Sequence, residues 1–256
     1  MKKRLLTLHH QGCSGGTVIS KAIASMLKTF VISEVHPDRV IHGFNPYDPI
    51  QNLLAQTNLR DDTRLKRDIF FQRINQCYEI SLKVKINLVF RDHSHSDYML
   101  EKDIKFIKNK SSLISLLSKS FNLISILTIR NPIESYISLC SNGQANSIKD
   151  FNDYCDRILL MTETYRTLGC EMIKYEDFCK NPKKTLKKIC KIYEIEFNEK
   201  FEDIFYKIPM TGDSGRGKKL NSIQTLKPKL VDDNLKKQAL SSQSYLKLCK
   251  DFNYDS

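Results

Sequence analysis

LLTLHHQGCSGGTVISKAIASML, residues 5–27, combines three local signals that together predict an α/β fold. Residues 5–8 form an apolar run typical of a β-strand. A turn rich in glycine and serine follows at 12–17, and the apolar residues after it recur with the period of one helix face. A strand, a glycine turn and a helix in this order direct backbone N–H groups and the positive end of the helix dipole at one point, which suits a phosphate.

The glycine turn (residues 12–17) differs from the GxxxxGK[ST] loop of nucleoside triphosphate hydrolases, in which a lysine reaches the phosphates. Gly16 stands before Thr17 where that lysine would be. Backbone amides and the Thr17 hydroxyl remain to hold an anion, and positive charge must come from elsewhere in the chain. The alternative is an ordinary βα connection with Thr17 as the helix N-cap, and the turn alone does not separate the two.

The composition is that of a globular protein with an excess of positive charge. A length of 256 residues suits one α/β domain, 1–256, and the 27% charged and 41% hydrophobic residues are ordinary. Lysine and arginine number 41 against 29 acidic residues, so the net charge is +12, which favours a polyanionic ligand. A lysine-rich solvated surface would give the same excess. Aromatic residues do not alternate with the basic runs, so nucleic acid is not an expected partner.

Eight cysteines are present without a CxxC pair, and several fall at apolar positions of predicted helices or strands. Reduced thiols of a cytoplasmic protein explain this better than disulfides or zinc, and no metal is expected. No run approaches the roughly 18 apolar residues of a membrane span. Residues 1–4 lead directly into the first strand, so we expect neither a signal peptide nor a membrane segment.

Strands and helices alternate along the rest of the chain. Further strands are predicted at 30–35, 87–92, 123–129 and 169–177, the third being the most apolar and therefore expected inside the sheet. Helices are predicted at 49–57, 61–84, 113–118, 133–140, 151–165, 181–193 and 232–252. This alternation predicts a parallel sheet with ligands at the carboxyl ends of its strands.

Polar groups follow three of the predicted strands, at 12–17, 91–95 and 130–138, and in a parallel sheet these ends meet at one crevice. Arg130 stands at a strand end, and Ser138 lies about two helical turns further on. A guanidinium and a hydroxyl so placed can both reach one phosphate, with the arginine giving a bidentate contact. A surface ion pair for Arg130 is the alternative.

At these positions the sequence resembles the PAPS-dependent sulfotransferases, PAPS being 3′-phosphoadenosine 5′-phosphosulfate. The glycine turn looks like that family's loop for the 5′-phosphosulfate, and Arg130-Asn131-Pro132 with Ser138 fits its Arg-x-Pro-x5-Ser element for the 3′-phosphate. Residues 173–178 are similar to its Tyr-Glu-Asp strand end, whose tyrosine contacts the adenosine. Residues 212–216 resemble its late Gly/Arg loop, which folds over the cofactor.

The resemblance implies a P-loop-like three-layer α/β domain with a central parallel sheet flanked by helices. It implies sulfuryl transfer from PAPS to a hydroxyl or amine of a small-molecule or carbohydrate acceptor; neither the acceptor nor the oligomeric state is indicated. The implied cofactor-binding residues are Gly12, Cys13, Ser14, Gly15, Gly16, Thr17, Arg130, Ser138, Tyr175, Ser214, Gly215 and Arg216.

The departures from the family bear on catalysis. The family usually has lysine or arginine where this chain has Cys13, and Gly16 replaces a hydroxyl residue. Another cation must then assist the leaving group, and the candidates are Arg91, Arg216 and Lys218. Without one, catalysis would be weakened.

The general base is expected among the histidines, all six of which lie at or before residue 95. His93 directly follows the third strand, where sulfotransferases carry their catalytic histidine, and is favoured, with His95 second. The alternative for either is a structural hydrogen bond.

Two other functions remain open from the sequence. A P-loop nucleotide kinase would use Asp92 as a Mg²⁺ ligand, although the turn lacks the lysine of such enzymes. A non-catalytic nucleotide-binding protein would keep Arg130, Ser138 and Tyr175 and tolerate Cys13.

Overall fold

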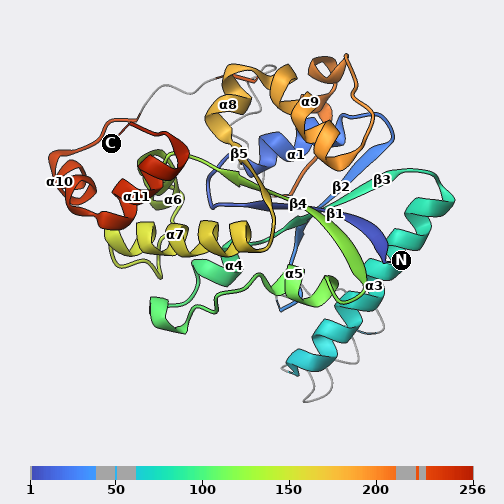
Figure 1. Cartoon of the computed structure of the whole chain (residues 1–256), viewed down its shortest axis with the longest axis horizontal. Coiled ribbons are helices and arrows are strands. Elements are labelled where there is room, and N and C mark those ends of the chain that lie inside the picture. The colour runs from blue at the N-terminus through green and yellow to red at the C-terminus, as the bar shows by residue number, and fades with distance from the viewer. Residues whose placement is uncertain (1, 39–49, 51–61, 212–222, 225–228, 256) are drawn as a thin grey trace.

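The computed structural model describes residues 2–38, 50, 62–211, 223–224 and 229–255. In Figure 1 a twisted sheet lies between two layers of helices. One layer contains α1 (Gly16–Ala24), α8 (Tyr175–Lys180) and α9 (Pro182–Tyr193). The other contains α3 (Thr63–Lys83), α5 (Ser112–Leu117), α6 (Pro132–Ser141) and α7 (Phe151–Thr167). The predicted three-layer α/β fold is confirmed.

The five strands of the sheet are all parallel, as predicted. Their order is β2 (Thr29–Val35), β3 (Asn87–Asp92), β1 (Lys3–His10), β4 (Phe121–Ile129) and β5 (Glu171–Lys174). β1 takes the middle position, and β4, the most apolar strand, lies inside the sheet between β1 and β5. Because β3, β1 and β4 are neighbours, the three polar strand ends singled out in the sequence meet at one edge.

Alternation along the strands divides the core between the two faces. Leu6 and Leu8 of β1, with Ile126 of β4, pack with residues of α1 and α9. Leu5 packs with α3 and α5, and Leu127 packs with α7. Both faces of the inner strands are therefore covered, which explains their nearly continuous apolar runs.

Helices α6 and α9 start where their sequences suggest. Asn131 caps α6 through its side chain, which accepts from the Ile133 N–H at 2.9 Å, and Pro132 is the first helical residue. Asn181 caps α9 in the same way, accepting from the Lys184 N–H at 3.0 Å. Four short helical elements lie elsewhere in the described chain: α4 (His95–Tyr98), η2 (Ile104–Phe106), η3 (Phe201–Asp203) and η4 (Phe205–Lys207).

Two predicted elements are wrong in their extent. Residues 175–177 were expected to continue a strand, but β5 stops at Lys174, where its partner β4 also ends, and Tyr175 begins α8. Two acidic residues in the first turn of α8 favour this helix start. The closing helix is divided into α10 (Asp233–Ser241) and α11 (Gln243–Phe252), because Ser242 is extended and caps α11.

Other sequence expectations concern features outside the sheet. All eight cysteines have free thiols, five of them buried. None of the helices in the described part of the chain is long and apolar enough to cross a membrane. The helix predicted at 49–57 lies, except for residue 50, outside the described residues.

Candidate active site

Gln11, the residue after β1, fixes the start of the glycine turn beside Arg130. Its backbone N–H donates to the Thr128 carbonyl at 3.0 Å, and its side-chain oxygen accepts from the Arg130 N–H at 3.0 Å. Its side-chain nitrogen donates to the hydroxyls of Ser135 and Tyr154, each at 2.7 Å. The ends of β1 and β4 are thus tied together, and the turn starts next to the strand end that carries the arginine.

The glycine turn has a left-handed backbone at two positions. Cys13 has φ 60° and Gly15 has φ 77°. Gly15, rather than Thr17, is the N-cap of α1. The Ser14 hydroxyl is buried and lies 3.1 Å from the Thr128 hydroxyl, so it faces the sheet. The first turn of α1, whose N–H groups have no partner within the helix, and the Thr17 side chain are what the turn offers to an anion.

Two glycines of the turn lie against side chains that leave no room for a Cβ. An ideal Cβ on Gly15 would be 2.2 Å from Tyr175 Cδ2, and one on Gly16 would be 2.9 Å from His10 Cγ. Contacts this short do not occur with a side chain in place. The glycines therefore allow Tyr175 and His10 to approach the turn from either side.

Arg130 links the glycine turn to α6. The side chain is 7% exposed, and its Nη1 donates to the Cys13 carbonyl at 3.2 Å and to Ser138 Oγ at 3.4 Å. Its Nη2 pairs with Glu134 at 3.1 Å, and the guanidinium lies 5.0 Å from the centroid of the Tyr175 ring. Arg130, Ser138 and Tyr175, which come from three separate motifs, therefore meet at one point.

Lys229 adds a second cation to this point and was missed by the sequence analysis. Its Nζ donates to Ser138 Oγ at 2.6 Å, and its backbone N–H donates to Glu134 Oε1 at 2.8 Å. No spacing or motif in the sequence signals this lysine. We call Arg130, Ser138, Lys229, Tyr175 and Gly15 the anion cradle.

Arg91, the candidate cation that lies within the described residues, contacts the first turn of α1. Its side chain is 3% exposed, and its Nη2 donates to Thr17 Oγ1 at 3.4 Å. Its Nη1 donates to Ser33 Oγ at 2.8 Å and to the Thr211 carbonyl at 3.1 Å, and it pairs with Glu34 at 3.0 Å. Burial lowers the pKa of Arg91, and the Glu34 carboxylate opposes this. A guanidinium does not lose its proton in proteins, so Arg91 supplies a positive charge.

The Cys13 thiol lies beside the end of α6 and not beside the first turn of α1. Its Sγ accepts from the Asn142 side chain at 3.4 Å and lies 3.8 Å from Gln144 Oε1, beside the end of α6. Four further predicted residues lie outside the described residues: Ser214, Gly215, Arg216 and Lys218.

The two histidines after β3 differ in their surroundings. His93 Nδ1 lies 2.6 Å from Ser96 Oγ and its Nε2 lies 3.3 Å from Glu34, so both ring nitrogens have partners. His95 Nδ1 would be 3.1 Å from a Cβ on Gly12, which places it against the glycine turn, and no hydrogen bond joins its ring to any described residue. Burial, with a smaller effect of His93, lowers the pKa of His95 to about 4.

His10, the last residue of β1, is a third histidine at the turn. Its Nδ1 lies 3.4 Å from the Gln11 carbonyl, and its buried Nε2 has no partner among the described residues. Burial, followed by the positive charge of Arg91, holds the pKa of His10 well below its ordinary value. The ring is therefore neutral and packs as a neutral group against Gly16.

Asp92, the residue that a kinase would use for Mg²⁺, faces a buried network. Its Oδ2 lies 2.8 Å from His9 Nδ1 and accepts from Ser94 Oγ at 3.0 Å and from the Tyr165 hydroxyl at 3.2 Å. The Asp92 and His9 side chains are both fully buried. Three partners on one oxygen give Asp92 a structural role beneath the site. No group of three or more His, Cys, Asp or Glu side chains in the described ranges is arranged to hold a metal ion.

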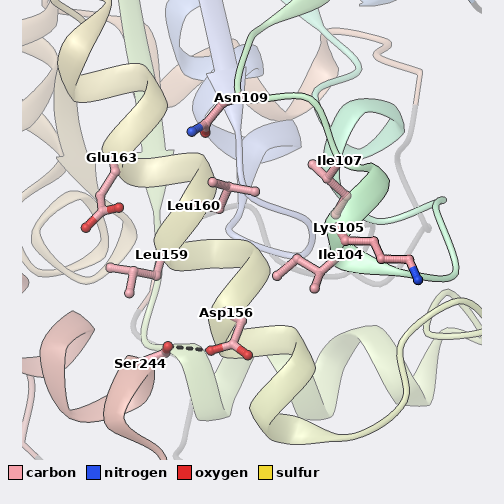
Figure 2. A pocket seen from close by; sticks show the side chains of 9 residues that line it. All are labelled: Ile104, Lys105, Ile107, Asn109, Asp156, Leu159, Leu160, Glu163 and Ser244. Atoms are coloured by element: carbon pink, nitrogen blue, oxygen red, sulfur yellow. Dashed lines mark hydrogen bonds between the residues drawn. The ribbon is translucent and has the colours of Figure 1, made fainter.

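A separate pocket of about 460 Å³ lies between α7 and the segment around η2 (Figure 2). Its walls include Ile104, Leu159 and Leu160, and the Ser244 hydroxyl at its edge bonds to Asp156. None of its lining residues belongs to the anion cradle. The pocket is therefore separate from the anion cradle.

Comparison with solved structures places the fold. The sulfotransferase domain of the olefin synthase from Synechococcus PCC 7002 superposes with a TM-score of 0.61 at 16% identity, over 100% of this chain and 97% of that one. The chain has the sulfotransferase fold. A second such domain, from the curacin biosynthetic pathway, gives 0.54 at 14% identity over 99% and 98% of the two chains. No protein-family model matches the chain, and no curated protein matches its sequence.

Proposed function

We propose that the protein is a sulfotransferase that uses PAPS to sulfate a hydroxyl or an amine of a small-molecule or carbohydrate acceptor. The observation that carries this proposal is the position of Arg130, which contacts the glycine turn and Ser138 and faces the Tyr175 ring. Three motifs that are weak one by one in the sequence thereby form a single anion cradle. PAPS supplies the sulfuryl group when bound, and the residues of the chain bind and orient it.

The anion cradle fits the nucleotide end of PAPS in its chemistry. Arg130 and Lys229 supply two positive charges, and Ser138 supplies a hydroxyl within hydrogen-bond distance of both. Charged donors of this kind are suited to a phosphate dianion, so we assign them to the 3′-phosphate. Glu134 accepts from the Arg130 guanidinium and from the Lys229 backbone N–H, so it holds both residues beside each other. Tyr175 presents its ring beside them for the adenosine.

The glycine turn and Arg91 are assigned to the phosphosulfate end. The close approach permitted by Gly15 and Gly16, together with the first turn of α1, suits an anion held by backbone amides. Arg91, fixed 3.4 Å from the Thr17 hydroxyl, supplies the charge that Cys13 lacks. Sulfuryl transfer resembles phosphoryl transfer, in which positioning and charge stabilisation dominate.

We propose His95 as the base that takes the acceptor proton. The position of His93 directly after the strand favoured it in the sequence, but Ser96 and Glu34 occupy its two ring nitrogens. His95 lies against the glycine turn and, with a pKa of about 4, is neutral at physiological pH. A neutral imidazole has a lone pair with which to accept a proton, and because a pKa of about 4 makes His95 a weak base, we expect the lower end of the usual contribution, about 10²-fold in rate.

The test combines ligand binding with turnover. PAP, the nucleotide left after transfer, should raise the melting temperature because a ligand that binds only the folded state stabilises it by mass action. ATP at the same concentration should raise it less, and labelled PAPS should transfer its sulfuryl group to an acceptor without added Mg²⁺. Stabilisation by ATP alone would favour a kinase. PAP binding without turnover across a broad acceptor panel would favour a non-catalytic nucleotide-binding protein.

A further inference from the structure

Glu34 stands at a β-bulge near the end of β2. Ile32 pairs with Phe90 and Val35 pairs with Asp92, so a step of three residues along β2 matches a step of two along β3. β2 therefore contains one extra residue here. Bulges of this kind re-aim side chains and are common next to active sites.

Glu34 also has a left-handed backbone, with φ 62°. Among the residues that the structure describes, the non-glycine residues with positive φ divide into two groups. Four lie where a helix gives way to the next element, an ordinary place for this conformation: Lys28, Lys85, Glu194 and Asn253. Cys13 and Glu34 lie at the candidate site instead. Such a residue costs stability and persists where its surroundings hold it, often at functional sites.

The bulge brings two consecutive side chains onto one atom of Arg91. Ser33 Oγ lies 2.8 Å and Glu34 Oε1 lies 3.0 Å from the same Nη1 nitrogen. In a regular strand, neighbouring side chains point to opposite faces, so only one of the two could make this contact. With Nη1 held in this way, Nη2 is left to contact Thr17 in the first turn of α1.

The other oxygen of Glu34 lies beside the His93 ring. Glu34 Oε2 lies 3.3 Å from His93 Nε2, and Ser96 Oγ lies 2.6 Å from His93 Nδ1. A carboxylate only accepts, so this contact favours the tautomer with the proton on Nε2, in which Nδ1 accepts from the Ser96 hydroxyl. The charged or titratable groups that face His93 are Glu34 and Asp92, which favour its protonation, and Arg91, His36 and His95.

We propose that Glu34 is a positioning residue whose strained bulge aims Arg91 at the first turn of α1 and fixes the tautomer of His93. Arg91 is then in place for the phosphosulfate end, and of the two histidines that follow β3, His95 is the one with a free lone pair. This inference rests on the proposed function. Neither the sequence pattern of β2 nor the resemblance to a family points to Glu34.

The experiment compares Glu34→Gly and Glu34→Gln with the control Glu194→Gly. Glu194 has the same left-handed backbone, with φ 47°, but caps α9 and is 71% exposed in its contact with Arg4. Glycine suits positive φ, so Glu194→Gly should melt at or above the wild-type temperature. Glu34→Gly gains in the same way but leaves the buried Arg91 without its carboxylate, so it should melt below Glu194→Gly and still fold, as circular dichroism would show. Turnover should fall about 100-fold in Glu34→Gly through misplacement of Arg91, and stay at the wild-type level in Glu194→Gly.

Two further readouts separate positioning from other roles. PAP affinity should stay within about threefold of wild type in Glu34→Gly, because Arg130 and Lys229 are untouched. The pKa of His93, measured by NMR in Glu34→Gln, should fall because a carboxylate that favours its protonation is gone. Wild-type turnover in Glu34→Gly would overturn the inference. So would loss of turnover in Glu34→Gln with His93 unchanged, since Glu34 would then act on the substrate itself. Absence of PAP binding and turnover in the wild type would instead refute the proposed function.

Discussion

The Tyr175 ring lies directly on Gly15, where an ideal Cβ would come within 2.2 Å of Tyr175 Cδ2. Gly15 caps α1 and Tyr175 begins α8, so this contact joins the glycine turn to the helix that follows β5. The Arg130 guanidinium lies 5.0 Å from the centroid of the same ring. One aromatic ring thus sets the position of both the turn and the arginine, and the anion cradle depends on the missing Cβ.

Gly15→Ala should therefore disrupt the cradle. The added methyl group would have to displace the Tyr175 ring, and the left-handed backbone would cost about 1–3 kcal/mol of unfolding free energy. PAP binding, measured by calorimetry, should weaken at least about tenfold. Gly143→Ala is the matched control, because Gly143 has φ 66° with nothing within 4 Å of its Cβ position. It should show only the part of the stability loss that comes from the left-handed backbone, with PAP affinity unchanged; equal effects on PAP binding would argue against the cradle.

Arg130→Ala should separate the two ends of the nucleotide. Because Arg130 is assigned to the 3′-phosphate, PAP affinity should fall by about 1.5–3 kcal/mol, the usual cost of a lost charged hydrogen bond. Adenosine 5′-phosphosulfate, which lacks that phosphate, should lose much less. Arg166→Ala, at a half-exposed arginine paired with Asp251, is the control for loss of a positive charge. Equal losses for both ligands would place Arg130 at another part of the nucleotide.

The parts of the candidate site that depend on local sequence signals could be predicted from the sequence. The strand, glycine turn and helix of residues 5–27 predicted the position of α1, and polar residues after apolar strands located Arg91 and Arg130 at one edge. Each signal lies within a few residues of the chain, so tertiary contacts are not needed to see it. The end of β5 was misjudged because it is set by the length of its partner β4.

The sequence could not predict the residues whose positions depend on contacts between parts of the chain that are far apart in sequence. Lys229 reaches Ser138 across 91 positions, and no pattern around it records that contact. Glu34 reads as an ordinary strand residue until the pairing of β2 with β3 reveals the bulge. The choice between His93 and His95 likewise depends on Glu34 and on the approach to Gly12, which are tertiary features.

Lys229→Met should lower the affinity for PAP. The variant keeps the length and apolar part of the side chain but removes the ammonium that donates to Ser138, so we expect about a tenfold loss at low salt. The loss should shrink as ionic strength rises if the charge acts on a phosphate. Lys236→Met removes an exposed lysine that pairs only with Asp233 at 3.0 Å within the described chain, and it should bind PAP as the wild type does. A loss in both variants would indicate a general effect of net charge.

Arg91, rather than Cys13, should carry the catalytic charge. Cys13→Ser should keep turnover close to wild type, because the thiol lies beside Asn142 and Gln144. Arg91→Met should lose about 10²–10³ in kcat, the usual cost of removing one charge-stabilising group. Arg91→Lys should recover part of that loss, with circular dichroism and melting temperature showing that each variant folds. A large loss in Cys13→Ser alone would reverse the assignment.

The pH dependence of kcat/KM should identify the general base. A histidine accepts a proton only when neutral, and burial lowers the pKa of His95 from 6.5 to about 4. His95 is therefore neutral above about pH 5, so kcat/KM should stay level from neutral pH down to about 5 and fall as the pH passes through 4. His95→Gln should lose about 10² in kcat with PAP affinity intact, whereas His93→Gln should lose much less. Burial also lowers the pKa of His93, so the variants decide between the two: an acid limb abolished in His93→Gln and kept in His95→Gln would assign the proton transfer to His93 instead.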